Sequence, residues 1–271
     1  MAIGFSNIPA DIRVPLFYAE MDNSAANSAS STMRRLIVAQ VNDNVAPSEV
    51  GKLVLVSSVA LAKSMGGQGS MLASMYETFR KADPIGEIWC LPLHNAEGAV
   101  AKGVLTLTGT ATQAGLLNLY VGGVRVQATV VNGATAAQAA TALAQKINAS
   151  ADLPVSAAAA EGVVTLSAKW TGDSGNDISL QFNRLGKSNG EETPAGLTSA
   201  VTAMTGGAGV PDQIAAVAAL GDEPFEFIAL PWSDLATLNT WQAVMDDSTG
   251  RWSWAKQLFG HVYSAKRGTV G

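Results

Sequence analysis

The sequence predicts an α/β fold with a mixed sheet and crossover helices, interrupted by an inserted β-rich α+β domain and preceded by an extended N-terminal arm. Three observations lead to this prediction. Short, nearly continuous apolar runs alternate with helical stripes from Leu36 onward and again after Gly209, as buried parallel strands and their helices do. Between these two stretches, residues 99–205 are rich in Thr, Ala and Gly. Residues 1–30 lack any helical stripe.

Composition narrows the function classes. The chain has 271 residues and a formal net charge of −5, with 48% hydrophobic and 14% charged residues. Soluble domains usually carry about 25% charged residues, so the low share suggests surface hidden by self-association. The acidic balance argues against direct nucleic-acid binding, which needs clustered Lys and Arg. No apolar run approaches the ~18 residues of a membrane span, and no leader pattern opens the chain, so we expect a cytosolic product without membrane insertion.

Residues 1–30 are predicted to form an extended N-terminal arm and linker. Pro15 cannot donate a ladder hydrogen bond, so the strand should lie at an edge or across another element. Residues 22–28 are typical of a flexible polar connection. An arm is therefore predicted, and a local edge strand of the same chain is the alternative. The apolar residues of the strand alternate with other side chains: Ile12, Val14, Leu16 and Tyr18.

The first part of the α/β core is predicted over residues 31–98. Strands are expected at 36–41, 53–56 and 87–91, the last closed by Pro92. Ser57 or Ser58 can cap a short helix, and Ser70 can cap a longer one. Cys90 lies in an apolar strand, where a buried thiol is expected, and a single cysteine forbids an internal disulfide.

Residues 99–205 are predicted to form the inserted β-rich domain. This segment has 3 aromatic residues, against 14 in the rest of the chain. Thr135 can cap a helix over 136–147 whose apolar stripe would face the strands. Short antiparallel strands with glycine turns are expected at five places: 104–108, 117–121, 124–131, 163–168 and 178–182.

The second part of the core is predicted over residues 206–271. The run 226–231 resembles 87–92 in chemistry, which suggests neighbouring strands of one sheet. Ser233 can cap a following helix, and a further helix is expected before a strand at 261–265. The chain stops where the next crossover helix should begin, so we expect a core that is incomplete at the C-terminus.

No constellation in the sequence points to catalysis. His94 and His261 lack partners at metal-ligand spacing, so neither a metal nor a cofactor is expected. Gly172-Asp173-Ser174-Gly175 matches the letters around a serine-protease nucleophile, but the histidine context is missing and the motif is ordinary turn chemistry. The glycines of 66–69 precede a helix without the lysine of a phosphate loop. We therefore expect no enzymatic activity and no catalytic residues.

Several segments resemble the contractile tail sheath proteins of Mu-like phages. They run in order along essentially the whole chain: 8–15 with Tyr18 and 22–24, then 55–58, 69–73, 87–93 and 260–269. Family members continue well past residue 271, so the resemblance implies an N-terminal portion. It also implies a core with a subtilisin-like fold, although the catalytic motifs of subtilases are not recognisable here.

The resemblance implies a mechanical function. Sheath subunits form stacked, commonly sixfold rings around a tail tube, with baseplate and tail terminator proteins as further partners. Extended arms complete a sheet in another subunit by β-augmentation, a role that the resemblance gives to Ile12, Val14, Leu16 and Tyr18. Contraction drives the tube through the host envelope for genome ejection. The expected location is the virion tail, assembled in the bacterial host cytoplasm.

Two alternatives from other classes stay open. A surface adhesin or carbohydrate-binding module could use the Thr-rich segment 99–205 and exposed tryptophans, because aromatic rings stack on sugars. A hydrolase would need a base and a nucleophile that the sequence does not bring together.

Overall fold

The computed structural model describes residues 33–46, 50–95 and 97–266. The predicted arm residues Ile12, Val14, Leu16 and Tyr18 lie outside the described residues. The contacts below fall within one unit of the chain, residues 33–271. Its strands form three sheets, so the predicted mixed α/β class is confirmed.

The first sheet has five strands in the order β12-β11-β1-β3-β2. All neighbouring pairs are parallel except β2 with β3. The predicted strands are present, but β3 continues through Pro92 instead of ending there. The two similar runs, β3 and β11, share the sheet but are separated by β1, so they are not neighbours. The bounds are β1 (Arg35–Gln40), β2 (Val54–Leu55), β3 (Ile88–Leu93), β11 (Phe227–Leu230) and β12 (His261–Ser264).

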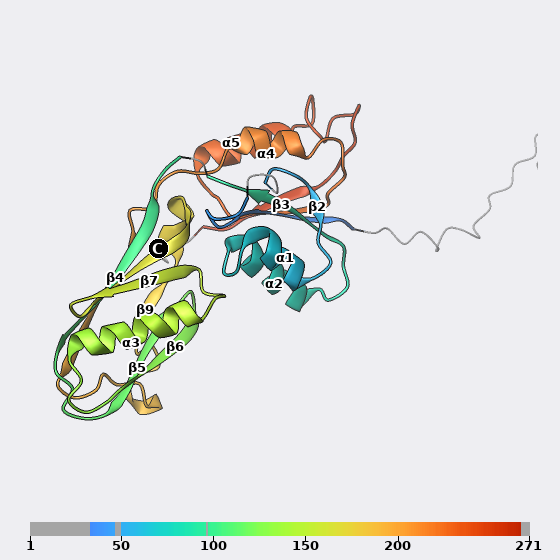
Figure 1. Ribbon diagram of the computed structural model, residues 1–271. Coiled ribbons are helices and arrows are strands. Elements are labelled where there is room, and N and C mark those ends of the chain that lie inside the picture. The colour runs from blue at the N-terminus through green and yellow to red at the C-terminus, as the bar shows by residue number, and fades with distance from the viewer. Residues whose placement is uncertain (1–32, 47–49, 96, 267–271) are drawn as a thin grey trace, which may run out of the picture. The chain divides into compact units, whose positions relative to one another are not determined.

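Two pairs of helices cover the two faces of this sheet (Figure 1). Along β1, Leu36 and Val38 belong to one apolar cluster, and Ile37 and Ala39 belong to another. This alternation is expected of a strand buried on both faces. The helices are α1 (Val59–Gly66) and α2 (Met71–Ala82) on one face, with α4 (Gln213–Ala219) and α5 (Leu235–Val244) on the other.

Side-chain caps fix where the helices begin. Ser58 and Ser70 accept hydrogen bonds from the N–H groups of Leu61 and Ala73, as predicted. The predicted cap of α5 at Ser233 is wrong by one residue, because Asp234 accepts the N–H of Thr237. None of the described helices is long and apolar enough to cross a membrane.

The segment before β12 contains turns where the sequence predicts a helix. The Asp246 carboxylate accepts hydrogen bonds from the N–H groups of Ser248 and Thr249, which closes a turn directly after α5. The hydrogen bond from the Ser248 hydroxyl, together with these backbone bonds, lowers the pKa of Asp246 to about 2. Further along, the N–H groups of Lys256 and Gln257 both donate to the carbonyl of Ser253, and Gln257 has a φ of 52°, which a right-handed helix does not contain. The predicted helix is therefore replaced by isolated turns.

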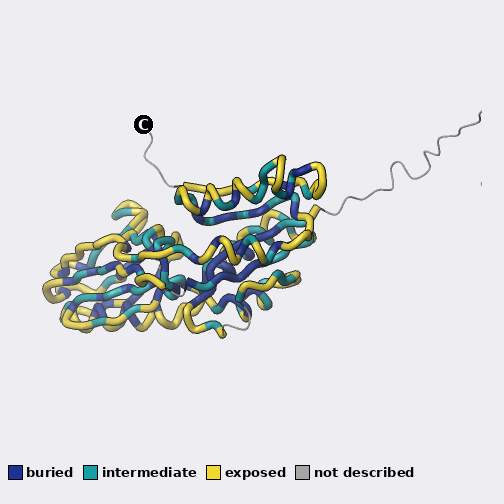
Figure 2. The backbone as a smooth tube through the Cα atoms, turned by 90° about the horizontal axis from the view of Figure 1, so that it is seen from above, coloured by how far each residue is buried: buried dark blue, intermediate teal, exposed yellow. Residues whose placement is uncertain are grey.

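Residues 99–205 contain the other two sheets, which enclose one apolar core with helix α3. Four strands run in the order β10-β4-β8-β7 and three in the order β6-β5-β9, all antiparallel. Figure 2 shows buried backbone inside and exposed backbone on the outer turns. The elements are β4 (Val100–Gly109), β5 (Gly115–Val121), β6 (Val124–Val130), α3 (Ala136–Ala149), β7 (Val155–Ala160), β8 (Val163–Thr171), η2 (Asp173–Asp177), β9 (Leu180–Phe182), η3 (Lys187–Asn189) and β10 (Leu197–Thr205).

Local chemistry explains three features of this segment. Gly122 and Gly123 join β5 to β6 with φ of 57° and 86°, a two-residue hairpin that requires left-handed backbone. Thr135 and Gln138 form a reciprocal capping box at the start of α3, as predicted. Asn148 of α3 bonds both the N–H and the C=O of Ala157, so its side chain occupies the outer edge of β7.

A buried carboxylate predicts a pH dependence of stability. Glu191 is 3% exposed and accepts hydrogen bonds from Tyr120 Oη at 2.5 Å and Leu185 N at 2.8 Å. Burial alone would raise the pKa of Glu191, but these bonds and Arg125 hold it below its ordinary value. Because the folded pKa is depressed, the stabilisation exists above the unfolded pKa and is lost as the pH falls through the folded one.

The free energy of unfolding should therefore fall on acidification below about pH 5, and Glu191→Gln should make this fall shallower. Urea unfolding at a series of pH values measures the slope, with the exposed neighbour variant Glu192→Gln as the control for net charge. An unchanged slope in Glu191→Gln would contradict the assignment.

Candidate functional site

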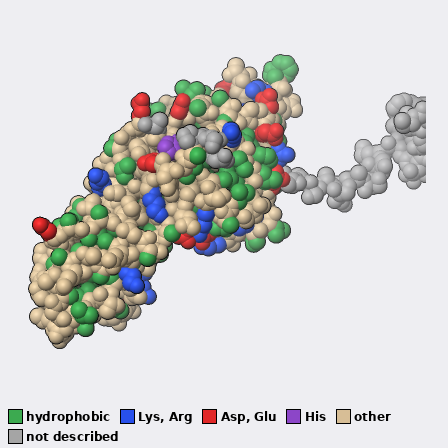
Figure 3. Space-filling view, viewed as in Figure 1, with side chains coloured by type: hydrophobic (Ala, Val, Ile, Leu, Met, Phe, Trp, Pro, Cys, Tyr) green, Lys and Arg blue, Asp and Glu red, His purple; other side chains and the backbone are tan. Residues whose placement is uncertain are grey.

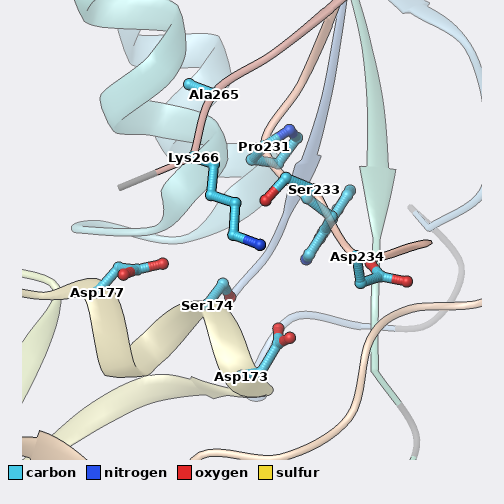
Figure 4. A pocket seen from close by; sticks show the side chains of 9 residues that line it. Asp173, Ser174, Asp177, Pro231, Ser233, Asp234, Ala265 and Lys266 are labelled. Carbon is cyan, nitrogen blue, oxygen red and sulfur yellow. The ribbon is translucent and has the colours of Figure 1, made fainter. Parts of the chain in front are cut away.

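A cavity of about 450 Å³ lies where η2 meets the carboxyl ends of β11 and β12. In α/β sheets, the carboxyl ends of the strands are the usual place for a binding site. Figure 4 shows Asp173, Ser174 and Asp177 on one side and Asp234 on the other, with the Lys266 side chain extending toward them. The rest of the lining comes from Pro231, Trp232, Ser233 and Ala265.

Ser174 has no catalytic partner in this cavity. Its hydroxyl donates to Gln40 Oε1 at 3.0 Å and accepts from Trp170 Nε1 at 3.0 Å. Gln40 is fully buried and also donates to the carbonyl of Thr171 at 2.5 Å. The hydroxyl is therefore used in a structural contact between β1 and the segment that follows β8.

The two histidines lie at opposite ends of the parallel strands. His261 is the first residue of β12 and pairs in register with Phe227, which in turn pairs with the first residue of β1. His94, in contrast, directly follows the carboxyl end of β3. No group of three or more His, Cys, Asp or Glu among the described residues could hold a metal ion. The cavity therefore lacks the base that a serine nucleophile needs.

Carboxylates dominate the electrostatics of the cavity. Burial raises the pKa of Asp173, and the negative charges of Asp234 and Asp177 add to the effect. Burial also acts to raise the pKa of Asp234, but hydrogen bonds from Thr237 at the start of α5 lower it overall. One oxygen of Asp173 and one of Asp234 are buried without a hydrogen-bond partner among the described residues.

Sequence reasoning missed Trp232, Asp234 and Lys266 as members of one site. A signal was available, because each follows a predicted strand of the same sheet at its carboxyl end. The position of Asp173 beside them could not be predicted, since it depends on how residues 99–205 pack against the sheet. Asp43 contributes to that packing by accepting hydrogen bonds from both the N–H and the hydroxyl of Thr171.

A second surface lies at the edge of the five-stranded sheet. Among the described residues, strand β12 pairs with β11 alone, and three of its four residues are exposed. Large aromatic side chains are exposed on and near it: Trp254 by 84%, Phe259 by 61% and Tyr263 by 56%. An open edge with apolar neighbours is a template for pairing with another strand.

Charged side chains are distributed unevenly over the face of the molecule that Figure 3 shows. In Figure 3 the face over β5, β6 and α3 carries few charged side chains, and charged and hydrophobic groups are mixed over the five-stranded part. Extended single-sign patches that would attract a polyanion are not seen on this face.

The contacts of Ser174 give a direct prediction. Ser174→Ala leaves Gln40 Oε1 and the Trp170 N–H without a partner, so the free energy of unfolding should fall by about 1–3 kcal/mol. Neither the wild type nor the variant should cleave a generic protein substrate. Chemical denaturation measures the free energy of unfolding, and a casein cleavage assay measures proteolysis. The variant Ser188→Ala, at an exposed position, is the control. Cleavage that disappears in Ser174→Ala would overturn the structural role.

Comparison with known proteins identifies relatives of the chain. No protein family model matches it. A curated relative, the Mu-like prophage FluMu tail sheath protein of Haemophilus influenzae, is 38% identical over 271 residues, which is 99% of this chain and 54% of the relative. The chain thus spans about half the length of that relative.

Two solved structures of tail sheath proteins are similar to a lesser degree. The sheath tail protein of Desulfitobacterium hafniense shares 15% identity at a TM-score of 0.35, covering 91% of this chain and 51% of that one. The protein Lin1278 of Listeria innocua shares 10% identity at a TM-score of 0.31, covering 82% and 46%. These TM-scores are too low to support an argument about the fold. Along nearly its whole length, the chain is thus similar in sequence to about half of the Mu-like prophage FluMu tail sheath protein.

Proposed function

We propose that the chain is part of the structural subunit of a contractile phage tail sheath. The observation that supports this is the 38% identity to a Mu-like prophage tail sheath protein along 99% of the chain. In this proposal the subunit polymerises around the tail tube and contracts to drive the tube through the host cell envelope for genome ejection. The proposed function is mechanical, and the subunit is proposed not to be an enzyme.

The proposed core is built from residues 31–98 and 206–271, with 99–205 as an insertion. The sheet topology supports this division, because every strand of the five-stranded sheet comes from outside 99–205 and every strand of the antiparallel sheets from inside it. We propose that the five-stranded sheet belongs to a subtilisin-like sheath core. The insertion would decorate the outside of the assembly.

Assembly is proposed to occur through the N-terminal arm. The alternating residues Ile12, Val14, Leu16 and Tyr18 would add a strand to the sheet of a second copy. Stacked rings, commonly sixfold in sheath proteins, are the proposed arrangement, with the tail tube, baseplate and tail terminator proteins as partners. The location would be the virion tail, after assembly in the host cytoplasm.

Co-sedimentation with tail tubes tests this function. The full-length gene product should pellet with preformed tubes of the tail tube protein from the same source, and it should stay in the supernatant with an unrelated filament. Failure to bind either filament would contradict the sheath proposal.

The alternative function is that of a surface adhesin or carbohydrate-binding module. The specific observation in its favour is Trp254, whose ring is 84% exposed, whereas Trp170, Trp232 and Trp241 are buried. A glycan array probed with the whole chain discriminates between the two functions. Binding that Trp254→Ala abolishes would favour the adhesin, and an array without signal would favour the sheath.

A further inference from the structure

Two asparagines of the chain, Asn132 and Asn189, are followed directly by glycine. Asparagine is chemically labile in this context, because a following residue without a Cβ leaves its backbone nitrogen open to attack on the asparagine side chain. Both asparagines are exposed and lie in the segment 99–205. In a folded chain, the reaction depends on how firmly each turn holds the side-chain Cγ and the glycine nitrogen, which must meet.

Asn132 lies in the turn between β6 and α3, outside any helix or strand. The N–H of Ala134 donates to the carbonyl of Val131 at 3.1 Å, so Asn132 and Gly133 are the central residues of this turn. Among the described residues, no group is hydrogen-bonded to the Asn132 side chain. One hydrogen bond opposes the reaction, because the N–H of Gly133 donates to the carbonyl of Ala111 at 2.7 Å.

Asn189 is held by more contacts. It is the last residue of η3, and its side-chain amide donates to the carbonyl of Leu185 at 2.8 Å and to the Ser188 hydroxyl at 3.4 Å. The N–H of Gly190 donates to the carbonyl of Lys187 at 3.0 Å. Both the side-chain amide and the glycine nitrogen must therefore be released here before they can react, whereas only the nitrogen must be released at Asn132.

We propose that Asn132 is a deamidation site of the folded chain and that the fold protects Asn189. The backbone nitrogen of Gly133 gives its proton to water and attacks Cγ of Asn132. The C–N bond of the side-chain amide breaks, and ammonia leaves with a proton from the solvent. A second water molecule then opens the resulting succinimide ring. Opening at the side-chain carbonyl gives aspartate, and opening at the main-chain carbonyl gives isoaspartate, so that in total one water is consumed and one ammonia is released.

The isoaspartate product disturbs the start of α3. Ala134 is 6% exposed, and its carbonyl accepts the N–H of Ala111 at 2.9 Å, which joins the turn to the connection between β4 and β5. Thr135, the next residue, caps α3. Isoaspartate adds a methylene to the main chain between Val131 and Ala134, so it changes the geometry of these contacts. Aspartate leaves the backbone unchanged.

Peptide mapping by mass spectrometry after incubation of the full chain in mildly alkaline buffer tests the proposal. Deamidation replaces NH₂ by OH, and the change in mass follows each site separately. Asn132 should react about tenfold faster than Asn189 or more, because Asn189 must break at least one further hydrogen bond first. In concentrated urea the two sites should react at similar rates, since the contacts that distinguish them are lost. Equal rates in the folded chain, or no reaction at Asn132 there, would overturn the proposal. The same rate difference in urea would also overturn it, because the difference would then come from the local sequence alone.

Two variants test the structural consequence. Asn132→Ser should abolish the modification at this turn, and Asn132→Asp supplies the charge of the product on an unaltered backbone. The aged wild type should therefore unfold at a lower urea concentration than aged Asn132→Asp, and the difference should grow with the fraction of isoaspartate. Equal midpoints at a high fraction of isoaspartate would contradict the effect on α3.

Discussion

Replacing Leu16 with aspartate is expected to abolish polymerisation of the full-length protein while leaving the fold of residues 33–266 intact. Leu16 lies in the apolar register of the predicted arm, with Ile12, Val14 and Tyr18. In the proposed assembly this register is buried against a second copy. An unpaired carboxylate in such a contact carries a desolvation cost of about 4 kcal/mol or more. This cost is a large part of the binding free energy of a single interface.

Sedimentation velocity measures the assembly, and circular dichroism on heating measures the fold. Asn27→Asp introduces the same charge in the polar connection after the arm and serves as the matched control. The control should polymerise like the wild type. Polymers of normal size from Leu16→Asp would remove the arm from the assembly.

Replacing Trp241 with alanine is expected to lower the free energy of unfolding by about 3–5 kcal/mol. Trp241 lies on α5, is 1% exposed and packs in the apolar cluster that contains Leu36 and Phe225. Its indole N–H donates to Gln213 Oε1 at 3.0 Å, so the substitution removes both a large buried ring and a buried hydrogen bond. Gln213 is itself buried, and the substitution would leave its Oε1 without this donor.

Trp254→Ala is the matched control, because it removes the same side chain from a position that is 84% exposed. Its effect should stay within about 0.5 kcal/mol. Urea unfolding of the three proteins gives the comparison. Equal losses in the two variants would show that the packing of α5 on the sheet is described wrongly.

The elements that could be predicted from sequence are those whose pattern depends on burial alone. The strands β1, β3 and β11 are buried on both faces, so their apolar runs are unmistakable. Strands β7 and β10 were missed, because they consist largely of Ala, Ser and Thr at a sheet edge and bury few of their side chains. Alanine has a low strand propensity, and only pairing with β8 and β4 fixes these segments.

The candidate site was less predictable than the fold. A turn could be predicted around Ser174, but the contact of its hydroxyl with Gln40, 134 residues away in the chain, could not. Asp173 and Asp234 meet only because residues 99–205 pack at the carboxyl ends of the strands. The arm residues, including Leu16, remain predictions from their alternating pattern and from resemblance.

Electron microscopy of negatively stained full-length gene product, expressed alone and together with the neighbouring tail genes, tests the central claim most directly. The account predicts hollow, striated cylinders or stacked rings, and it predicts that cylinders formed with the tail genes enclose a tube. Dispersed particles under both conditions would contradict the sheath function and would favour the adhesin.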